Sequence, residues 1–192
     1  MNRRWLALLL PLTLGACGYN TIQSYDEQAS AAQGQIEVQL QRRADLIPSL
    51  VATVKGFASQ ELAVFGEVAR ARGGLLGAVQ SKDPEQMANA NATMNGALGR
   101  LLAVSEAYPQ LKSDQSFLHL QDELAGTENR VAVARTDYNG AVQQYNSYIR
   151  RFPAVLTAKM TGAKERKYFT ATNAEAREAP KVDFGTPGAK KP

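Results

Sequence analysis

A heptad repeat over residues 116–152 is the feature that most constrains the fold of this 192-residue chain. Large and small side chains at this spacing form a stripe along a helix, which packs closely against its neighbours with a slight left-handed supercoil. Pro153 ends the pattern, because proline has no amide hydrogen and its ring clashes with the preceding turn. The large residues of the stripe are Phe117, Leu124, Val131, Tyr138, Tyr145 and Phe152; those beside them, mostly small, are Leu120, Thr127, Ala134, Ala141 and Tyr148.

Residues 21–72 carry a second helical pattern, with an apolar stripe that sharpens from Ile36 onward. Two charged residues, Arg43 and Glu61, interrupt that stripe. Pro48 removes one backbone hydrogen bond, so it predicts a kink, or a break with Asp45 capping a new helix. The pair Gly73-Gly74 predicts the end of the segment.

Strong start and stop signals delimit the remaining helices. Asp83-Pro84-Glu85-Gln86 predicts a helix start, with Asp83 as cap and Pro84 in the first turn. This helix is expected to close at Pro109, and Ser113 and Asp114 offer caps for the long heptad helix. A short helix is expected over residues 154–160, ending near Gly162.

These segments predict an all-α antiparallel helical bundle. It has three long helices and a short C-terminal helix, or four helices if the first breaks near Pro48. The expected divisions are a signal peptide at 1–16, a helical domain at 17–169 and a C-terminal tail at 170–192. The tail is expected to be disordered, because it has no periodic apolar residues to offset the entropy of ordering.

The amino terminus reads as a secretory signal that ends in a lipidation motif. Arg3 and Arg4 precede a short apolar run, which is too short for a bilayer span of roughly 20 residues. The tetrapeptide Leu14-Gly15-Ala16-Cys17 resembles the bacterial lipobox, in which the cysteine is acylated after cleavage before it. Three acyl chains would anchor the protein permanently. By the sorting rule of such lipoproteins, Gly18 implies the outer membrane facing the periplasm, with the inner membrane as the alternative.

Composition excludes several classes of function. The formal charge of +4 includes Arg3 and Arg4, and no stripe of lysine or arginine indicates nucleic-acid binding. Cys17 is the only cysteine, so internal disulfides and cysteine-rich metal sites are ruled out. The only histidine, His119, is expected on the outer face of its helix together with Asp122 and Arg150. No catalytic residue, cofactor site or metal site is predicted.

The tandem pairs Tyr138-Asn139 and Tyr145-Asn146 come nearest to a binding motif. Their tyrosines lie on the stripe and their asparagines beside it, which favours core packing with polar edges over a ligand site.

Several ordered motifs strongly resemble the LemA family, over roughly residues 19–169. They include QLQRRADLIPSLV (39–51), VKGF (54–57), Glu61, ARAR (69–72), EAYPQLK (106–112), LQDEL (120–124), TENR (127–130), AR (134–135), both Tyr-Asn pairs, and the IR (149–150) and FP (152–153) dipeptides. The resemblance implies a four-helix bundle displayed outside the cytoplasm on a membrane anchor, with no established enzymatic activity. The chain departs from the common family pattern in its anchor. Many relatives look like signal-anchor proteins, whereas this chain has a lipobox. By analogy, a membrane metalloprotease or a TPM-domain envelope protein is the implied partner.

Two functions therefore remain open. The first is a lipid-anchored envelope scaffold or adaptor without catalysis. The second is an envelope enzyme or small-ligand carrier that uses Glu61, Glu106 and Glu128, since paired carboxylates can perform acid–base chemistry when burial separates their pKa values. Two free carboxylates in one pocket would indicate the enzyme, and paired charges would indicate the scaffold.

The charges on the stripe are expected to have opposite partners on other helices, because an unpaired charge is costly in a helix interface. A count at about 1.5 Å per residue places Glu61 near Arg100 and Arg43 near Glu106, with Glu128 level with Glu61. The predicted structural or interaction residues are Arg42, Arg43, Asp45, Glu61, Arg100, Glu106, Glu128, Tyr138, Asn139, Tyr145 and Asn146.

Overall fold

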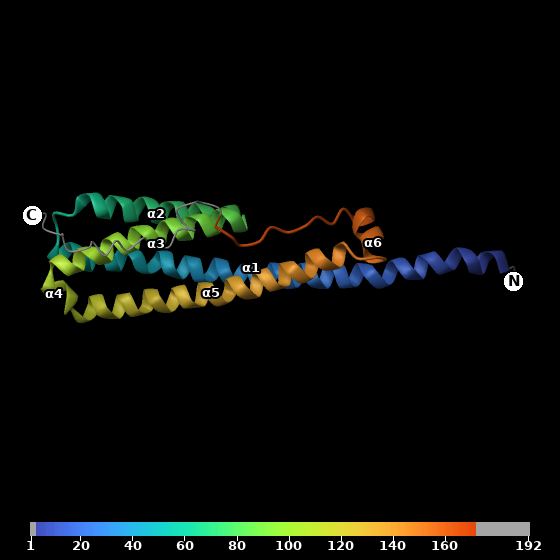
Figure 1. Ribbon diagram of the computed structural model, residues 1–192, viewed down its shortest axis with the longest axis horizontal. Coiled ribbons are helices and arrows are strands. Elements are labelled where there is room, and N and C mark those ends of the chain that lie inside the picture. The colour runs from blue at the N-terminus through green and yellow to red at the C-terminus, as the bar shows by residue number, and fades with distance from the viewer. Residues whose placement is uncertain (1–2, 172–192) are drawn as a thin grey trace, which may run out of the picture.

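The chain forms an elongated bundle of helices (Figure 1). The computed structural model describes the backbone of residues 3–171 and the side chains of residues 18–171. Within that range the regular elements are all helices, as predicted. They are α1 (Arg3–Phe57), α2 (Leu62–Ser81), α3 (Pro84–Ala107), α4 (Pro109–Lys112), α5 (Gln115–Ile149) and α6 (Ala154–Thr161). The rest of the predicted tail, residues 172–192, lies outside the described residues.

Two antiparallel pairs of helices make up the bundle. The long helices α1 and α5 lie side by side along most of the molecule, and α2 and α3 pack on one half of them (Figure 1). One end of the bundle, which we call the far tip, holds the α1–α2 connection and α4. At the opposite end, α6 packs on α1 and α5, beyond the reach of α2 and α3.

The heptad stripe of α5 forms part of the core, as predicted. Phe117, Leu124, Val131, Tyr138 and Tyr145 are buried, whereas His119, Asp122 and Arg150 are exposed. The prediction is wrong at Phe152, which is 81% exposed. The helix ends at Ile149, three residues before Phe152, so the phase of the stripe is lost there.

Of the two predicted alternatives at Pro48, a kink or a break, the break is wrong, because α1 continues through this residue. Proline cannot donate to the carbonyl four residues earlier, which belongs to Ala44. Nε of Arg72 on α2 donates to that carbonyl instead, at 2.8 Å. The proline ring is exposed, so helix packing does not exclude it. Asp45 consequently lies inside α1 rather than at a cap.

The first long segment breaks instead at residues 58–61, and Gly73-Gly74 lie inside α2. The predicted end at these glycines is therefore wrong. Both glycines are exposed, so they leave the buried stripe of Phe65, Val68 and Leu75 intact.

The predicted caps form as expected. Asp83 accepts hydrogen bonds from the backbone N–H groups of Glu85 at 2.9 Å and Gln86 at 3.1 Å. Asp114 caps α5 by accepting from Phe117 N at 2.9 Å. The short helix α6 ends at Gly162, whose φ of 72° lies in the left-handed region that suits glycine.

After α6 the chain runs as an extended segment, residues 163–171, back toward the α2–α3 turn (Figure 1). We call this segment the strap. Its Phe169 is 3% exposed and belongs to the core, so the ordered structure continues beyond the last predicted helix.

Candidate functional site

The strap is held by the tandem Tyr-Asn pairs of α5. Asn146 donates to Arg166 O at 2.9 Å and accepts from Arg166 N at 2.8 Å. Asn139 bonds Phe169 in the same two-way manner, donating to its carbonyl at 3.3 Å and accepting from its N–H at 2.8 Å. Because the asparagines are seven residues apart, both amides lie on the same face of α5 and engage the strap at two points. The Tyr-Asn motif therefore binds the chain's own C-terminal segment.

The tyrosines of the same pairs complete this clamp. Tyr138 is buried and its hydroxyl donates to Lys167 O at 2.8 Å. Burial raises the pKa of Tyr138 to about 12. Tyr145 lies under the guanidinium of Arg166, 5.9 Å from ring centroid to Cζ, and burial raises its pKa too. The prediction of core packing with polar edges is confirmed for the tyrosines, but the strap was not predicted as the partner of the asparagines.

Two basic side chains of the strap join it to distant helices. Arg166 donates to Asp26 Oδ1 and to Ser30 Oγ on α1, each at 2.7 Å. Lys167 pairs with Asp83, the cap of α3, at 2.8 Å. These contacts raise the pKa of Lys167 and, with help from the backbone amides of Gln86 and Glu85, lower the pKa of Asp83. The strap thereby links α1, α5 and the α2–α3 turn.

A second polar cluster surrounds Arg43, which is 5% exposed. Its guanidinium forms an ion pair with Glu128 on α5 and donates to Asn91 Oδ1 on α3 at 3.1 Å. Asn95 donates to the other oxygen of Glu128 at 3.2 Å. Burial lowers the pKa of Arg43 to about 10, so the side chain remains protonated at neutral pH. The prediction that Arg43 meets an opposite charge on another helix is correct, but the predicted partner, Glu106, is wrong.

The other predicted pairing is also wrong. Arg100 pairs with Glu67 at 2.6 Å, and Glu61 is the residue that precedes α2, at its N-cap. Glu106 pairs with Lys112 at 2.7 Å. The count failed because the first segment turns at residues 58–61, so that the next predicted helix, α3, packs mainly on α2 and less on α1.

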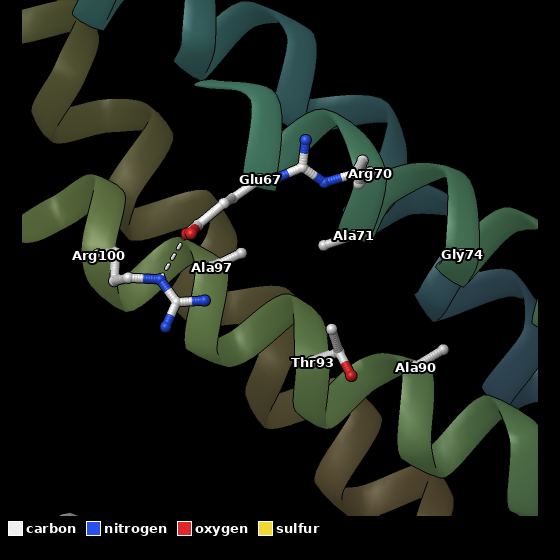
Figure 2. A pocket seen from close by; sticks show the side chains of 8 residues that line it. All are labelled: Glu67, Arg70, Ala71, Gly74, Ala90, Thr93, Ala97 and Arg100. Carbon is white, nitrogen blue, oxygen red and sulfur yellow. Dashed lines mark hydrogen bonds and ion pairs between the residues drawn. The ribbon is translucent and has the colours of Figure 1, made fainter. Parts of the chain in front are cut away.

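A hollow of about 330 Å³ lies between α2 and α3. Figure 2 shows Glu67 and Arg100 joined across one end of it, with Arg70 beside them. The rest of its lining is made of small residues, Ala71, Gly74, Ala90, Thr93 and Ala97. The single carboxylate here is paired with an arginine, so the hollow does not offer the pair of free carboxylates that acid–base catalysis requires.

The remaining predicted residues lie on the surface of α1. Arg42 and Asp45 are exposed and border a hollow of about 530 Å³ beside Val79 of α2. Asp45 accepts a hydrogen bond from Gln41 at 3.0 Å. Among the described residues no group of three or more histidine, cysteine, aspartate or glutamate side chains is arranged to hold a metal ion. None of the described helices is long and apolar enough to cross a bilayer.

The fold and its contacts define an all-helical bundle protein whose C-terminal strap is clamped by side-chain amides. The chain belongs to the LemA family, which its residues 32–184 match.

Three magnetosome proteins are among its relatives. Magnetosome proteins MamQ 1 and MamQ 2 of Paramagnetospirillum magneticum are each 30% identical to it over 174 residues, covering 79% of this chain. The alignment spans 64% of each of those relatives. Magnetosome protein MamQ of Magnetospirillum gryphiswaldense is 28% identical over 187 residues, which cover 85% of this chain and 69% of the relative.

Sequence reasoning missed the strap and its ion pairs with Asp26 and Asp83. Two signals pointed to it: asparagines repeated seven residues apart beside a buried stripe, and a basic-aromatic segment at 164–169 without helical periodicity. Neither signal alone shows that the two segments meet.

Proposed function

We propose that this chain is a lipid-anchored scaffold or adaptor of the bacterial envelope, facing the periplasm from the outer membrane. The observation that carries the proposal is the course of α1. This helix is continuous from residue 18, next to the expected acylation site, to Phe57 at the far tip. At 1.5 Å per residue that distance is about 60 Å. An acylated Cys17 would thus hold a rod by one end, with its length free for a partner.

The state of the carboxylates supports a role without catalysis. Glu128 is paired with a buried arginine and Glu106 with a lysine, while Glu61 sits at the start of α2. None of these three residues, which would carry the alternative function of enzyme or ligand carrier, lines either of the two hollows described above.

The anchor is tested by Cys17→Ser. This variant should lose labelling by a fatty-acid probe and accumulate as soluble or unprocessed protein, because the thiol is the acylation site. The wild-type chain, labelled in parallel, is the control. A variant that is processed normally and still fractionates with the outer membrane in high salt would disprove the lipoprotein assignment.

The scaffold role is tested by photo-crosslinking in the intact envelope followed by mass spectrometry. Crosslinkers at Leu62, 69% exposed near the far tip, and at Val133, 62% exposed on α5, sample separate surfaces. We expect at least one position to capture a single envelope protein, with a membrane metalloprotease or a TPM-domain protein as the family analogy. A crosslinker at the buried Leu101 is the control. Capture of no protein at any exposed position would contradict a scaffold.

A further inference from the structure

The short helix α6 presents its large apolar side chains to solvent rather than to the bundle. Ala154 and Ala158 are 4% exposed and pack inward, Ala158 with Ile22 and Tyr145. On the opposite side, Leu156 is 55% exposed and Met160 is 89% exposed. Together with Phe152 before the helix, 81% exposed, these residues form what we call the α6 outer face. A surface helix normally turns its large apolar residues inward, so this reversed arrangement calls for a partner.

Basic residues flank the α6 outer face in the sequence. Residues 150–164 contain Arg150, Arg151, Lys159 and Lys164 and no aspartate or glutamate. Arg150 forms an ion pair with Glu165, with 3.5 Å between Nη1 and Oε1. Arg151, Lys159 and Lys164 are exposed. Apolar residues framed by lysine and arginine are typical of helices that lie in the headgroup region of a membrane and attract anionic lipids.

The α6 outer face lies at the end of the molecule where the anchor is expected. A Cβ placed on Gly18 would lie 3.4 Å from Thr157 Oγ1 and 3.9 Å from Ala154 Cα. α6 therefore packs directly against the residue that follows Cys17. A lipid attached at Cys17 would hold α6 close to the bilayer, at a high effective concentration.

We propose that the α6 outer face inserts into the headgroup region of an anionic phospholipid bilayer beside the lipid anchor. This inference rests on the proposed anchoring for its place at the membrane. A protein partner or a second copy is less well matched, because residues 150–164 carry four cations and no acidic residue and lie where lipid would be the nearest surface. Insertion of α6 next to the anchor gives two points of attachment, and the rod then has a fixed orientation to the bilayer.

The test places an environment-sensitive fluorophore on Met160→Cys of the mature protein, reconstituted in vesicles. Cys17 is the only native cysteine, so acylation leaves position 160 as the single free thiol. In vesicles of phosphatidylcholine with phosphatidylglycerol, the emission should shift to the blue and be quenched by a bilayer-borne quencher. The matched control is Val133→Cys, an exposed apolar position on α5, whose label should stay in water.

The charge requirement is tested in the same system. Arg151→Gln with Lys159→Gln should lower the inserted fraction relative to the exposed fraction by roughly 25-fold, about fivefold for each charge. Arg70→Gln with Arg135→Gln, two exposed cations outside this face, should leave it unchanged. A label at 160 that stays aqueous in anionic vesicles would overturn the inference, as would a blue shift that depends on protein concentration and therefore reports a second copy.

Mass spectrometry of the same preparation separates the two proposals. If the protein is acylated but the label at position 160 stays in water, the proposed anchor stands and the proposed insertion of the α6 outer face is disproved. If Cys17 is not acylated, the anchor is disproved, and the response of Cys17→Ser with Met160→Cys to added vesicles decides the α6 outer face by itself.

Discussion

At the scale of single residues, the buried guanidinium of Arg43 is a charge in the core that needs polar partners. Its ion pair with Glu128 and its bond to Asn91 join three helices. Removing one member of a buried pair is worse than removing both, because the remaining charge is left in a medium of low dielectric constant.

We expect Glu128→Gln to lower the free energy of unfolding by about 2–3 kcal/mol. This is less than the cost for a fully buried pair, since the Glu128 side chain is 39% exposed. A double-mutant cycle with Arg43→Met, followed by urea denaturation, should give a coupling energy above about 1 kcal/mol. The cycle for Glu106 and Lys112, both exposed, is the control and should give less. Equal couplings would contradict the structural role of the buried pair.

Leu124 and His119 test the helical phase of α5. Leu124 is 7% exposed, so Leu124→Ala should cost on the order of 2–5 kcal/mol through lost packing and the cavity left behind. His119→Ala, at an exposed position of the same helix, should be nearly silent. Thermal and urea denaturation measure both changes. Similar, small losses at the two positions would show that the phase is wrong.

The pKa of Tyr138 makes stability depend on alkaline pH. The unfolded chain releases this proton near pH 10, whereas the folded chain holds it until about 12. Between these values the folded state binds more protons, so this tyrosine's contribution is complete below pH 10 and is lost as the pH approaches 12. Relative to Tyr138→Phe, the wild type should lose stability faster across this window. Parallel curves for the two proteins would contradict the burial of the hydroxyl.

At the scale of elements, the strap depends on the amides of α5. Asn146→Ala leaves the N–H and carbonyl of Arg166 without their partner and should cost about 1–3 kcal/mol. Limited trypsin digestion should then cut faster after Arg166 and Lys167, because the strap opens locally. Asn129→Ala, at an exposed asparagine of the same helix, should leave the cleavage rate unchanged. Equal rates for both variants would show that the amide does not hold the strap.

The elements differ in how far the sequence predicts them. Helix starts at Asp83 and Asp114 are local, since a cap bonds backbone only two or three residues away. Pro48 wrongly suggested a break, because the backbone hydrogen bond that it cannot donate to Ala44 O is replaced by one from the side chain of Arg72, twenty-four residues later. The break at residues 58–61 contains neither glycine nor proline, so no local signal marks it. The strap joins residues up to 140 positions apart, and only the folded chain reveals that contact.

At the scale of the whole molecule, we expect the C-terminal region to have a part that folding requires, the strap, and a part that folding does not require, residues 172–192. Truncation after Ala171 removes residues 172–192 and should leave the melting temperature unchanged, since their composition offers little apolar surface for folding. Truncation after Ala163 also removes the buried Phe169 and the clamp contacts. That variant should melt lower by on the order of 10 °C. A large drop in melting temperature after the first truncation would show that folding requires residues 172–192.

The bond from Arg72 to Ala44 has a mechanical consequence. Because α1 continues past Pro48, a single uninterrupted helix runs from residue 18 to Phe57. A hinge at the proline would absorb any tension or axial rotation applied at the residue-18 end of the helix. In a continuous helix, such a load is instead passed along α1 to the α1–α2 connection.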